Sequence, residues 1–132
     1  MKYNITVKEI MQNNFRIVDS SEPLTNCASL TGDKNACLIM HEGQFRGVLT
    51  PEKIIEGFLD GVNMVEEVKF VKDLGMVDAK EDISYLINLF EKTNIKYILV
   101  KEDDNIIGLV SRDDLKKVAP LIVNSFLQYS FH

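Results

Sequence analysis

The residues with the clearest capacity for chemistry in this 132-residue chain lie between Gly108 and Asp114, in the order Gly-Leu-Val-Ser-Arg-Asp-Asp. An apolar strand that turns here into a helix would leave unpaired backbone amides at the positive helix end, which favours a phosphate. Ser111 adds a hydroxyl donor, and Arg112 can add charge-assisted hydrogen bonds. The Asp114 carboxylate accepts hydrogen bonds and suits the two hydroxyls of a ribose, while Gly108 permits close approach of its backbone. The segment therefore predicts an anion pocket at a strand-to-helix junction.

The same spacing also has an explanation that involves no ligand. Ser111 followed three residues later by Asp114 matches a helix capping box, which stabilises a helix start by ~1 kcal/mol. The local sequence leaves both interpretations open.

A second, incomplete version of the segment runs from Gly47 to Lys53, as Gly-Val-Leu-Thr-Pro-Glu-Lys. Thr50 takes the place of the serine and is a candidate ligand contact, but Thr50 followed by Pro51 is also ordinary helix-start chemistry. Lys53 replaces the expected ribose acceptor with a cation, which is unfavourable at the positive helix end. Lys53 could reach a phosphate bound at the other copy or pair with a nearby acid. We expect one complete site rather than two.

Both segments belong to an internal duplication. Ala36–Ile54 can be laid on Tyr97–Leu115 without a gap at a constant offset of 61 residues, and hydrophobic, small and hydroxyl positions fall in register. Upstream, Ile17–Asp19 resembles Met76–Asp78 at an offset of 59. The chain is therefore a tandem repeat of one supersecondary unit.

Each repeat is predicted to run strand, helix, strand, strand, helix. In the second repeat, Ile83, Leu86, Ile87 and Phe90 recur at helical spacing. The expected strands are 15–18, 36–40 and 44–49 in the first repeat and 76–77, 97–100 and 106–110 in the second. Helices are expected from Pro23, from Thr50, over 83–90 and from Ser111, with a short helix over 6–11 and a helical connector over 60–69.

Composition bounds the class of protein. With 45% hydrophobic and 27% charged residues the chain is ordinary for a globular protein, and its net charge of −5 disfavours direct binding to nucleic acid. No apolar run approaches the ~20 residues of a membrane span, and the N-terminus lacks the apolar stretch of a signal peptide. Cys27 and Cys37 are too far apart for a Cys-x-x-Cys motif and are expected in the core. We expect a cytoplasmic protein with no membrane partner.

No pattern in the sequence indicates catalysis or a metal site. Asp103 and Asp104 lie between two predicted strands, which favours a hairpin tip over a metal pair. His41 and His132 have no Cys or His at ligand spacing. Phosphate-loop, hydrolase-elbow and His-Glu-x-x-His patterns do not occur, so we expect that the chain is not an enzyme.

The pattern of Gly108, Ser111 and Asp114, repeated in part from Gly47, resembles the nucleotide-binding signature of cystathionine-β-synthase (CBS) domains. The segment Val7-Lys8-Glu9-Ile10-Met11 resembles the way such repeats begin, and the resemblance covers roughly residues 7–119. It implies an α/β (α+β) fold in which two CBS-type β-α-β-β-α repeats pack as a pseudo-twofold pair. The expected divisions are 1–63 for the first repeat with its N-terminal helix, 64–119 for the second repeat and 120–132 for a C-terminal helical tail.

The resemblance also implies a regulatory function. Such a module would bind an adenine nucleotide (AMP, ADP or ATP) or S-adenosylmethionine, and would pass the change to a homodimer partner or to a fused or separate effector domain. By resemblance, the adenine base would lie near four residues of the second repeat, Met76, Val77, Tyr97 and Ile98. The alternative is a dimerisation or protein-interaction module of the same fold with a vestigial ligand site.

Overall fold

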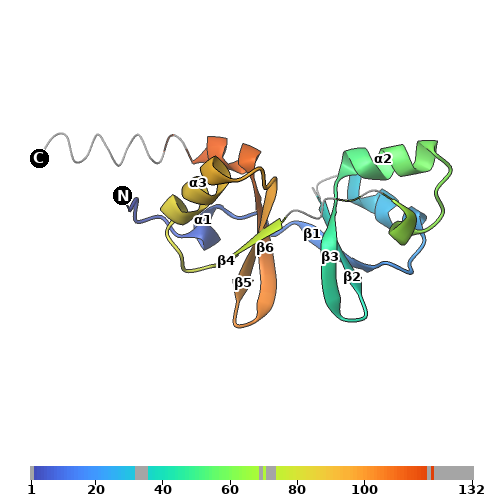
Figure 1. Ribbon diagram of the computed structural model, residues 1–132, viewed down its shortest axis with the longest axis horizontal. Helices are drawn as coiled ribbons and strands as arrows, with labels where there is room; N and C mark the ends of the chain where they lie inside the picture. Colours follow the sequence, from blue (N-terminus) through green and yellow to red (C-terminus); the bar gives the residue numbers. More distant parts are fainter. Residues whose placement is uncertain (1, 32–35, 69, 71–73, 119, 121–132) are drawn as a thin grey trace, which may run out of the picture. The chain divides into compact units, whose positions relative to one another are not determined.

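The computed structural model describes residues 2–31, 36–68, 70, 74–118 and 120, and the chain divides into two compact units (Figure 1). The first-repeat unit comprises Asn14–Asp73. The second-repeat unit combines the N-terminal segment up to Asn13 with the chain from Leu74 onward. Each unit contains one three-stranded sheet. Of the tail expected over 120–132, only Pro120 lies within the described residues.

The first-repeat unit has the strand order β1-β2-β3, with β1 parallel to β2 and β2 antiparallel to β3. Its elements are β1 (Phe15–Asp19), the 3-10 helix η1 (Leu24–Thr31), β2 (Ala36–His41), β3 (Gln44–Leu49), α2 (Pro51–Leu59) and the 3-10 helix η2 (Val65–Glu67). Thr50 caps α2 and Pro51 occupies its first turn, as the sequence predicts. Within the described part of the connector expected over 60–69, η2 is the only helical segment.

The second-repeat unit has the strand order β4-β5-β6 with the same parallel and antiparallel pairing. Its elements are α1 (Val7–Ile10), β4 (Leu74–Asp78), α3 (Ile83–Lys92), β5 (Tyr97–Glu102), β6 (Asn105–Ser111) and the 3-10 helix η3 (Arg112–Lys117). Asp82 caps α3 by accepting a hydrogen bond from the Ser84 N–H at 3.0 Å. The apolar side chains of α1 and α3 pack on the sheet in one core.

The predicted duplication is confirmed by the strand registers. The pair Ile39 and Gly47 in the first hairpin corresponds to Val100 and Gly108 in the second, at the predicted offset of 61 residues. Each ladder has its irregularity directly after the first residue of that pair, between positions 39 and 40 and between positions 100 and 101. The two hairpins therefore share their backbone geometry down to the position of a bulge.

The equivalent helices of the two repeats differ in type. The second repeat forms the α-helix α3, whereas the segment after Pro23 forms the 3-10 helix η1. The η1 sequence, Leu-Thr-Asn-Cys-Ala-Ser-Leu-Thr, is rich in residues with low helix propensity, while α3 carries a regular apolar stripe. The helix expected from Ser111 is likewise a 3-10 helix, and Pro120 follows shortly after its end.

Helix α1 lies in the second-repeat unit, although the sequence grouped it with residues 1–63. The N–H groups of Val7 and Lys8 donate to the carbonyls of Glu81 and Ala79, at 2.8 and 3.0 Å. The Val7 side chain is fully buried in the core of this unit. The backbone hydrogen bonds and the burial of Val7 both involve residues distant in the chain, and they determine which sheet the N-terminal segment joins.

Helix η2 takes the equivalent place in the first-repeat unit. The N–H groups of Val65 and Glu66 donate to the carbonyls of Glu22 and Ser20, both at 3.0 Å, and Val65 is fully buried. Each sheet is thus completed by the segment that precedes the other repeat in the chain.

Both cysteines lie in the core of the first-repeat unit. Cys27 and Cys37 are free thiols with no exposed surface, as the sequence predicts. The contact with Cys27 and the burial of the group both raise the pKa of the Cys37 thiol. Both residues are buried and therefore fill the core as small apolar side chains.

Candidate functional site

The predicted residues Tyr97, Ser111, Arg112 and Asp114 lie at one end of the second-repeat sheet, whereas Gly108 and Val77 lie further along it, in register with Val100. Strand β6 ends at Ser111 and η3 begins at the next residue. Ser111 is the register partner of Tyr97 at the start of β5, and Tyr97 is the partner of Leu74 at the start of β4. Strands β4 and β5 therefore begin at the edge where β6 ends, and the short helix η3 carries Arg112 and Asp114 there.

The carboxylate of Asp114 is buried at this junction, with 2% of the residue exposed. The Ser111 N–H donates to its Oδ2 atom at 2.8 Å, and the Ser111 hydroxyl lies 3.1 Å from the same oxygen. The side-chain amide of Gln12 donates to both carboxylate oxygens, at 2.6 Å to Oδ1 and 2.7 Å to Oδ2. The predicted capping box is confirmed, and these donors compensate the burial of a charged group. The ligand role of Asp114 stays a prediction.

Gln12 is a member of this site that the sequence did not identify. Its N–H donates to the Leu109 carbonyl at 2.8 Å, and the Leu109 N–H donates back at 2.9 Å, so residue 12 pairs with β6. Gly108 permits this approach, because a Cβ atom there would lie 2.3 Å from the Met11 sulfur and 3.0 Å from the Gln12 carbonyl oxygen. In the structure, Met11 and Gln12 make this close approach to Gly108, and the approach of a ligand there stays a prediction. No local pattern could predict a contact between residues 102 positions apart.

The Arg112 guanidinium is directed to the C-terminal end of α3. It donates to the carbonyls of Phe90, Thr93 and Ile95, the last at 3.1 Å, and lies over the Phe90 ring at 5.2 Å from its centroid. Carbonyls at a helix end lack partners inside the helix, so a cation there is favourable. Arg112 therefore has a structural explanation in this fold, and its assignment to a phosphate stays a prediction.

The four residues expected around an adenine base differ in accessibility. Val77 and Ile98 are buried in the core, with 3% and 0% exposed. Met76 is 48% exposed, and Tyr97 is partly buried at the sheet end beside Ser111. Of these four side chains, those of Met76 and Tyr97 are therefore accessible, whereas Val77 and Ile98 belong to the core. Contact of any of them with a base stays a prediction.

The incomplete copy of the motif, in the first-repeat unit, forms a helix cap. The Thr50 hydroxyl accepts a hydrogen bond from the Lys53 N–H at 3.3 Å, and Thr50 is 7% exposed. The Lys53 ammonium lies 3.2 Å from the Glu56 carboxylate one turn later. Of the two possibilities for Lys53, pairing with a nearby acid is therefore the one that the structure contains.

The predicted hairpin tip is confirmed at Asp103 and Asp104, which have φ values of 50° and 66° in the two-residue turn between β5 and β6. Among the described residues, no group of three or more His, Cys, Asp or Glu side chains gathers as metal ligands would. Within the same ranges, no helix has both the length and the apolar character needed to cross a bilayer.

Comparison with known proteins links this geometry to one family. Residues 65–120 match the family model described as CBS domain. A comparison with curated proteins found no match.

Several solved structures share the fold. An uncharacterised conserved protein from Pyrococcus horikoshii is 20% identical, with a TM-score of 0.67 over 90% of this chain and 95% of that one. The CBS domain pair of protein MJ0100, in complex with 5′-methylthioadenosine and S-adenosyl-L-methionine, is 19% identical, with a TM-score of 0.67 over 88% and 96% of the chains. A CBS domain protein of unknown function from Thermoplasma acidophilum is 19% identical, with a TM-score of 0.63 over 96% and 76%.

Proposed function

Because residues 65–120 form a CBS domain and the whole chain has the fold of a CBS domain pair, we propose that the protein is a regulatory module that binds an adenosyl ligand at the junction of β6 and η3. A similar CBS domain pair has been crystallised with two adenosyl compounds. The observation that carries the proposal for this chain is the fixed carboxylate of Asp114, held between the Ser111 N–H and the Gln12 amide.

The contact of the Gln12 amide with Asp114 supports a ribose site at this carboxylate. The amide donates to both oxygens of Asp114. The two hydroxyls of a ribose are also hydrogen-bond donors, so they could bind the same two oxygens. Exchange of the amide for the diol would keep the carboxylate hydrogen-bonded, so burial of the charge would not oppose it. The ribose site therefore opens when the Gln12 side chain moves away.

Among adenosyl compounds, we propose those without phosphate groups, such as S-adenosylmethionine and methylthioadenosine, over AMP, ADP or ATP. Arg112 already serves three carbonyl groups at the end of α3. The helix η3 has six residues in 3-10 geometry, which gives it a small dipole for an anion. The net charge of −5 adds repulsion to a polyphosphate. Met76 and Tyr97 would contact the base.

Release of Gln12 provides a route for the signal. Residue 12 pairs with Leu109 of β6, and α1 directly precedes it in the chain. A ligand that binds only when this side chain has moved would shift the population of the attached segment. We propose that a second copy of the chain or an effector domain reads this change.

The alternative, an interaction module without a ligand, is favoured by one observation. The described residues Ser111 and Gln12 already supply donors to both oxygens of Asp114, so its burial requires no ligand. In that case Gln12 would be a permanent strut between the N-terminal segment and η3, and adenosyl compounds would not bind.

Thermal unfolding of the full chain with a ligand panel distinguishes these functions. We expect S-adenosylmethionine and methylthioadenosine to raise the midpoint, since a ligand that binds the native state stabilises it, and AMP, ADP and ATP to have smaller effects. Asp114→Asn keeps the shape of the side chain but removes one acceptor and the charge, and it should abolish the shift.

Asp113→Asn is the matched control, because Asp113 is exposed and pairs only with Lys116 among the described residues. It should leave the ligand shift intact. No shift with any compound would support the interaction module, and a shift that survives Asp114→Asn would remove this site assignment.

A further inference from the structure

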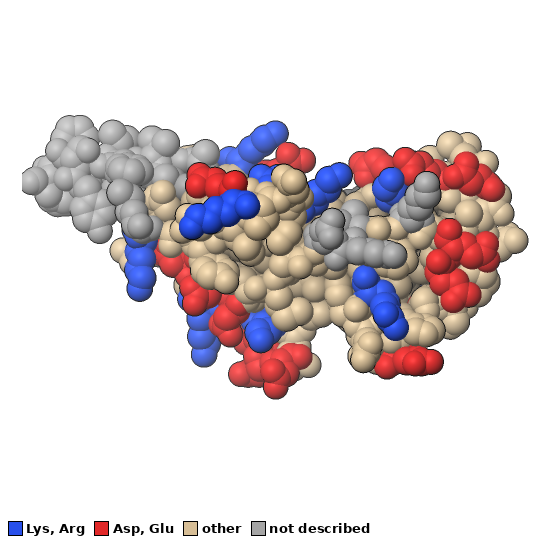
Figure 2. All heavy atoms as spheres, in the orientation of Figure 1, with Lys and Arg blue, Asp and Glu red and all other residues tan. Residues whose placement is uncertain are grey.

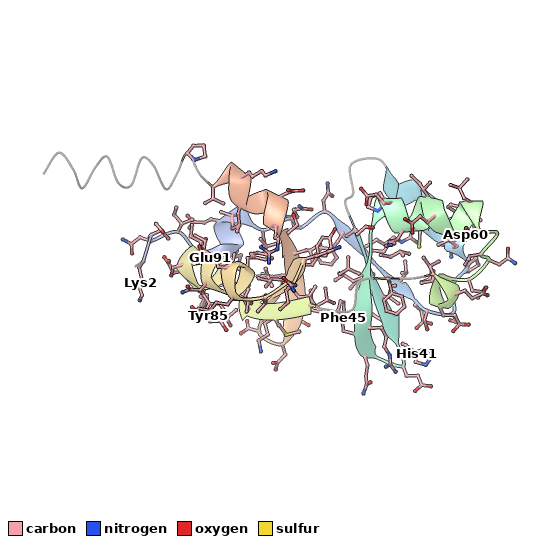
Figure 3. All side chains as sticks on the ribbon, turned by 45° about the horizontal axis from the view of Figure 1, so that its top comes forward. Lys2, His41, Phe45, Asp60, Tyr85 and Glu91 are labelled. Carbon is pink, nitrogen blue, oxygen red and sulfur yellow. The ribbon has the colours of Figure 1, made fainter. Side chains whose placement is uncertain are left out.

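A pocket in the first-repeat unit lies at the opposite end of its sheet from Thr50 and is not part of the site described above. Its cavity of about 220 Å³ is lined by Ser20, Ile39, His41, Arg46, Glu66 and Phe70. His41 lies at the hairpin end of β2, where it pairs with Gln44 (Figure 3). Ile39 and Phe70 supply an apolar wall, and the other four residues supply polar groups with different charges. A small pocket with a few convergent polar groups is the usual form of a ligand site.

A buried serine orients the histidine of this pocket. The Ser20 hydroxyl lies 2.6 Å from His41 Nδ1, and Ser20 is 5% exposed. In a neutral ring that accepts at Nδ1, the proton is on Nε2, which leaves a donor on the far side of the imidazole. The Nε2 atom lies 3.7 Å from a Glu42 carboxylate oxygen, beyond hydrogen-bond range.

The charged side chains of Arg46 and Glu66 are available to bind a ligand. Within the described ranges, neither the Arg46 guanidinium nor the Glu66 carboxylate has a hydrogen bond or an ion pair. Arg46 therefore offers a fork of donors and Glu66 a pair of acceptors to the same cavity. The two opposite charges are presented together beside an apolar wall.

The second repeat shows that the fold does not require these residues. The positions equivalent to Ser20, His41 and Arg46 are Ala79, Glu102 and Ile107, at the offsets of 59 and 61 residues. The backbone hydrogen bond at this position is the same in the two repeats, because the N–H groups of Ser20 and Ala79 donate to the equivalent carbonyls of Met40 and Lys101, at 2.8 and 2.9 Å.

The partner of Glu102 in the second repeat also has its equivalent. Lys8 is the equivalent of Glu66, because the N–H group of each donates to the carbonyl of an equivalent residue, Ala79 or Ser20. The Lys8 ammonium forms an ion pair with Glu102 at 3.1 Å. In the first repeat the corresponding residues are Glu66 and His41, which flank the pocket. The fold therefore does not require the polar pocket residues of the first repeat, which are Ser20, His41, Arg46 and Glu66.

We infer that this pocket binds a small zwitterion with an apolar body, the chemistry of a free apolar amino acid. The α-carboxylate would accept from Arg46 and from His41 Nε2, the ammonium would donate to Glu66, and the side chain would lie against Ile39 and Phe70. The cavity is smaller than the ~300 Å³ at which drug-sized sites begin, which fits a compact metabolite.

The surrounding charge disfavours a phosphate in this pocket. Ten acidic and six basic residues lie between positions 14 and 73, and Figure 2 shows acidic side chains gathered on the visible face of the unit that carries α2. Asp19 and Glu42 are the further acids near His41, and the Ser21 hydroxyl and amide hold the pKa of Asp19 below its usual range. A dianion would meet net repulsion, whereas a zwitterion adds no net charge.

Isothermal titration calorimetry of the full chain with L-leucine and L-phenylalanine, up to ~10 mM, tests the inference. We expect saturable binding of at least one amino acid. Isocaproate lacks the ammonium group, isoamylamine lacks the carboxylate and glycine lacks the apolar body, so each should bind at least about tenfold more weakly. Absence of heat with both amino acids, or equal binding of isocaproate, would overturn the inference.

Variants connect the binding to the pocket. Arg46→Ile introduces the residue found at the equivalent position of the second repeat, Ile107, and Glu66→Gln removes the negative charge of the acceptor. Each change should weaken amino acid binding about tenfold or more. Glu67→Gln removes the same charge one residue away and outside this pocket, and it should have no effect. Binding that Arg46→Ile leaves unchanged would also contradict the inference. Asp114→Asn should not alter amino acid binding, which separates this result from the adenosyl site.

Discussion

The side-chain amide of Gln12 donates to both carboxylate oxygens of Asp114, at 2.6 and 2.7 Å, and so joins the N-terminal segment to the start of η3. The contact occupies the acceptors that a ribose would need. It also replaces the solvent that the buried carboxylate has lost. Gln12 therefore stabilises the junction, and under the proposed function it would compete with the ribose of the ligand.

Gln12→Ala should separate these two effects. The free energy of unfolding should fall by about 1.5–3 kcal/mol, the range for a hydrogen bond to a charged group. The affinity for S-adenosylmethionine should rise, because the ligand no longer displaces the amide. Urea unfolding and calorimetric titration measure the two quantities. Gln44→Ala, at an exposed position on β3, is the control and should change neither. Weaker ligand binding by Gln12→Ala would show that the amide is a ligand contact rather than a competitor.

Gly108→Ala should open the same junction from the strand side. The new Cβ atom would lie 2.3 Å from the Met11 sulfur and 3.0 Å from the Gln12 carbonyl oxygen. We expect a loss of about 1–3 kcal/mol in unfolding free energy, as for overpacked sites. Faster hydrogen exchange of the Leu109 amide should accompany the loss, since this amide donates to Gln12.

A double-mutant cycle divides the Gly108 effect between its two contacts. Met11→Ala removes the closest atom, so the pair Met11→Ala and Gly108→Ala should be more stable than the sum of the single changes predicts. The clash with the Gln12 backbone should remain. Additive free energies would mean that the methionine side chain had already moved aside.

The sequence predicted the parts of this site that depend on local spacing. Ser111 and Asp114 were expected to form either a capping box or a ligand pocket, and the capping box is present because its donors and acceptors lie within one turn. The duplicated hairpins were predicted correctly, since short continuous apolar runs and the turn residues between them repeat at one offset. Gln12 escaped prediction because its partner is distant in the chain.

The errors concern helix type and the pairing of segments. The helix after Pro23 was expected from the position of proline, but the low propensity of η1 leaves it in 3-10 geometry. The N-terminal helix was grouped with the repeat that follows it, whereas its amides bind carbonyls of the second-repeat unit. Neither the choice of sheet nor the burial of Val7 is encoded by a local pattern.

Arg112→Ala tests whether this arginine serves the fold or the ligand. Its donors bind the carbonyls of Phe90, Thr93 and Ile95, so its loss leaves the end of α3 without these partners. Chemical unfolding should show a loss of about 1.5–3 kcal/mol. Arg112→Lys should recover part of this, because an ammonium group cannot supply the same planar fork. The affinity for adenosyl compounds should be unchanged, and a selective loss of affinity for AMP would instead restore the predicted phosphate contact.

Stability should fall in acid through Asp82. Burial opposes ionisation of this carboxyl, but the backbone N–H groups of Ser84 and Tyr3 outweigh it and lower the pKa of Asp82 to about 2. A group with a depressed folded-state pKa stabilises the protein fully above its unfolded pKa of ~3.9, and this contribution is lost as the pH falls from about 4 towards 2. Urea midpoints measured across this range should drop more steeply for the natural chain than for Asp82→Asn. Equal slopes would exclude Asp82 as the source.

Val7→Ala and Val65→Ala test the exchange of segments between the units. Both side chains are fully buried, and each follows the same pattern of backbone bonds, Val7 to Glu81 and Val65 to Glu22. Removal of two buried carbon atoms should cost about 2 kcal/mol in each case. Because local opening reports the unit that is weakened, Val7→Ala should increase hydrogen exchange in β4, β5 and β6. Val65→Ala should increase it in β1, β2 and β3, and each variant thus serves as the control for the other. If Val7→Ala instead loosened β1 to β3, the N-terminal helix would belong to the first-repeat unit, as its position in the sequence first suggested.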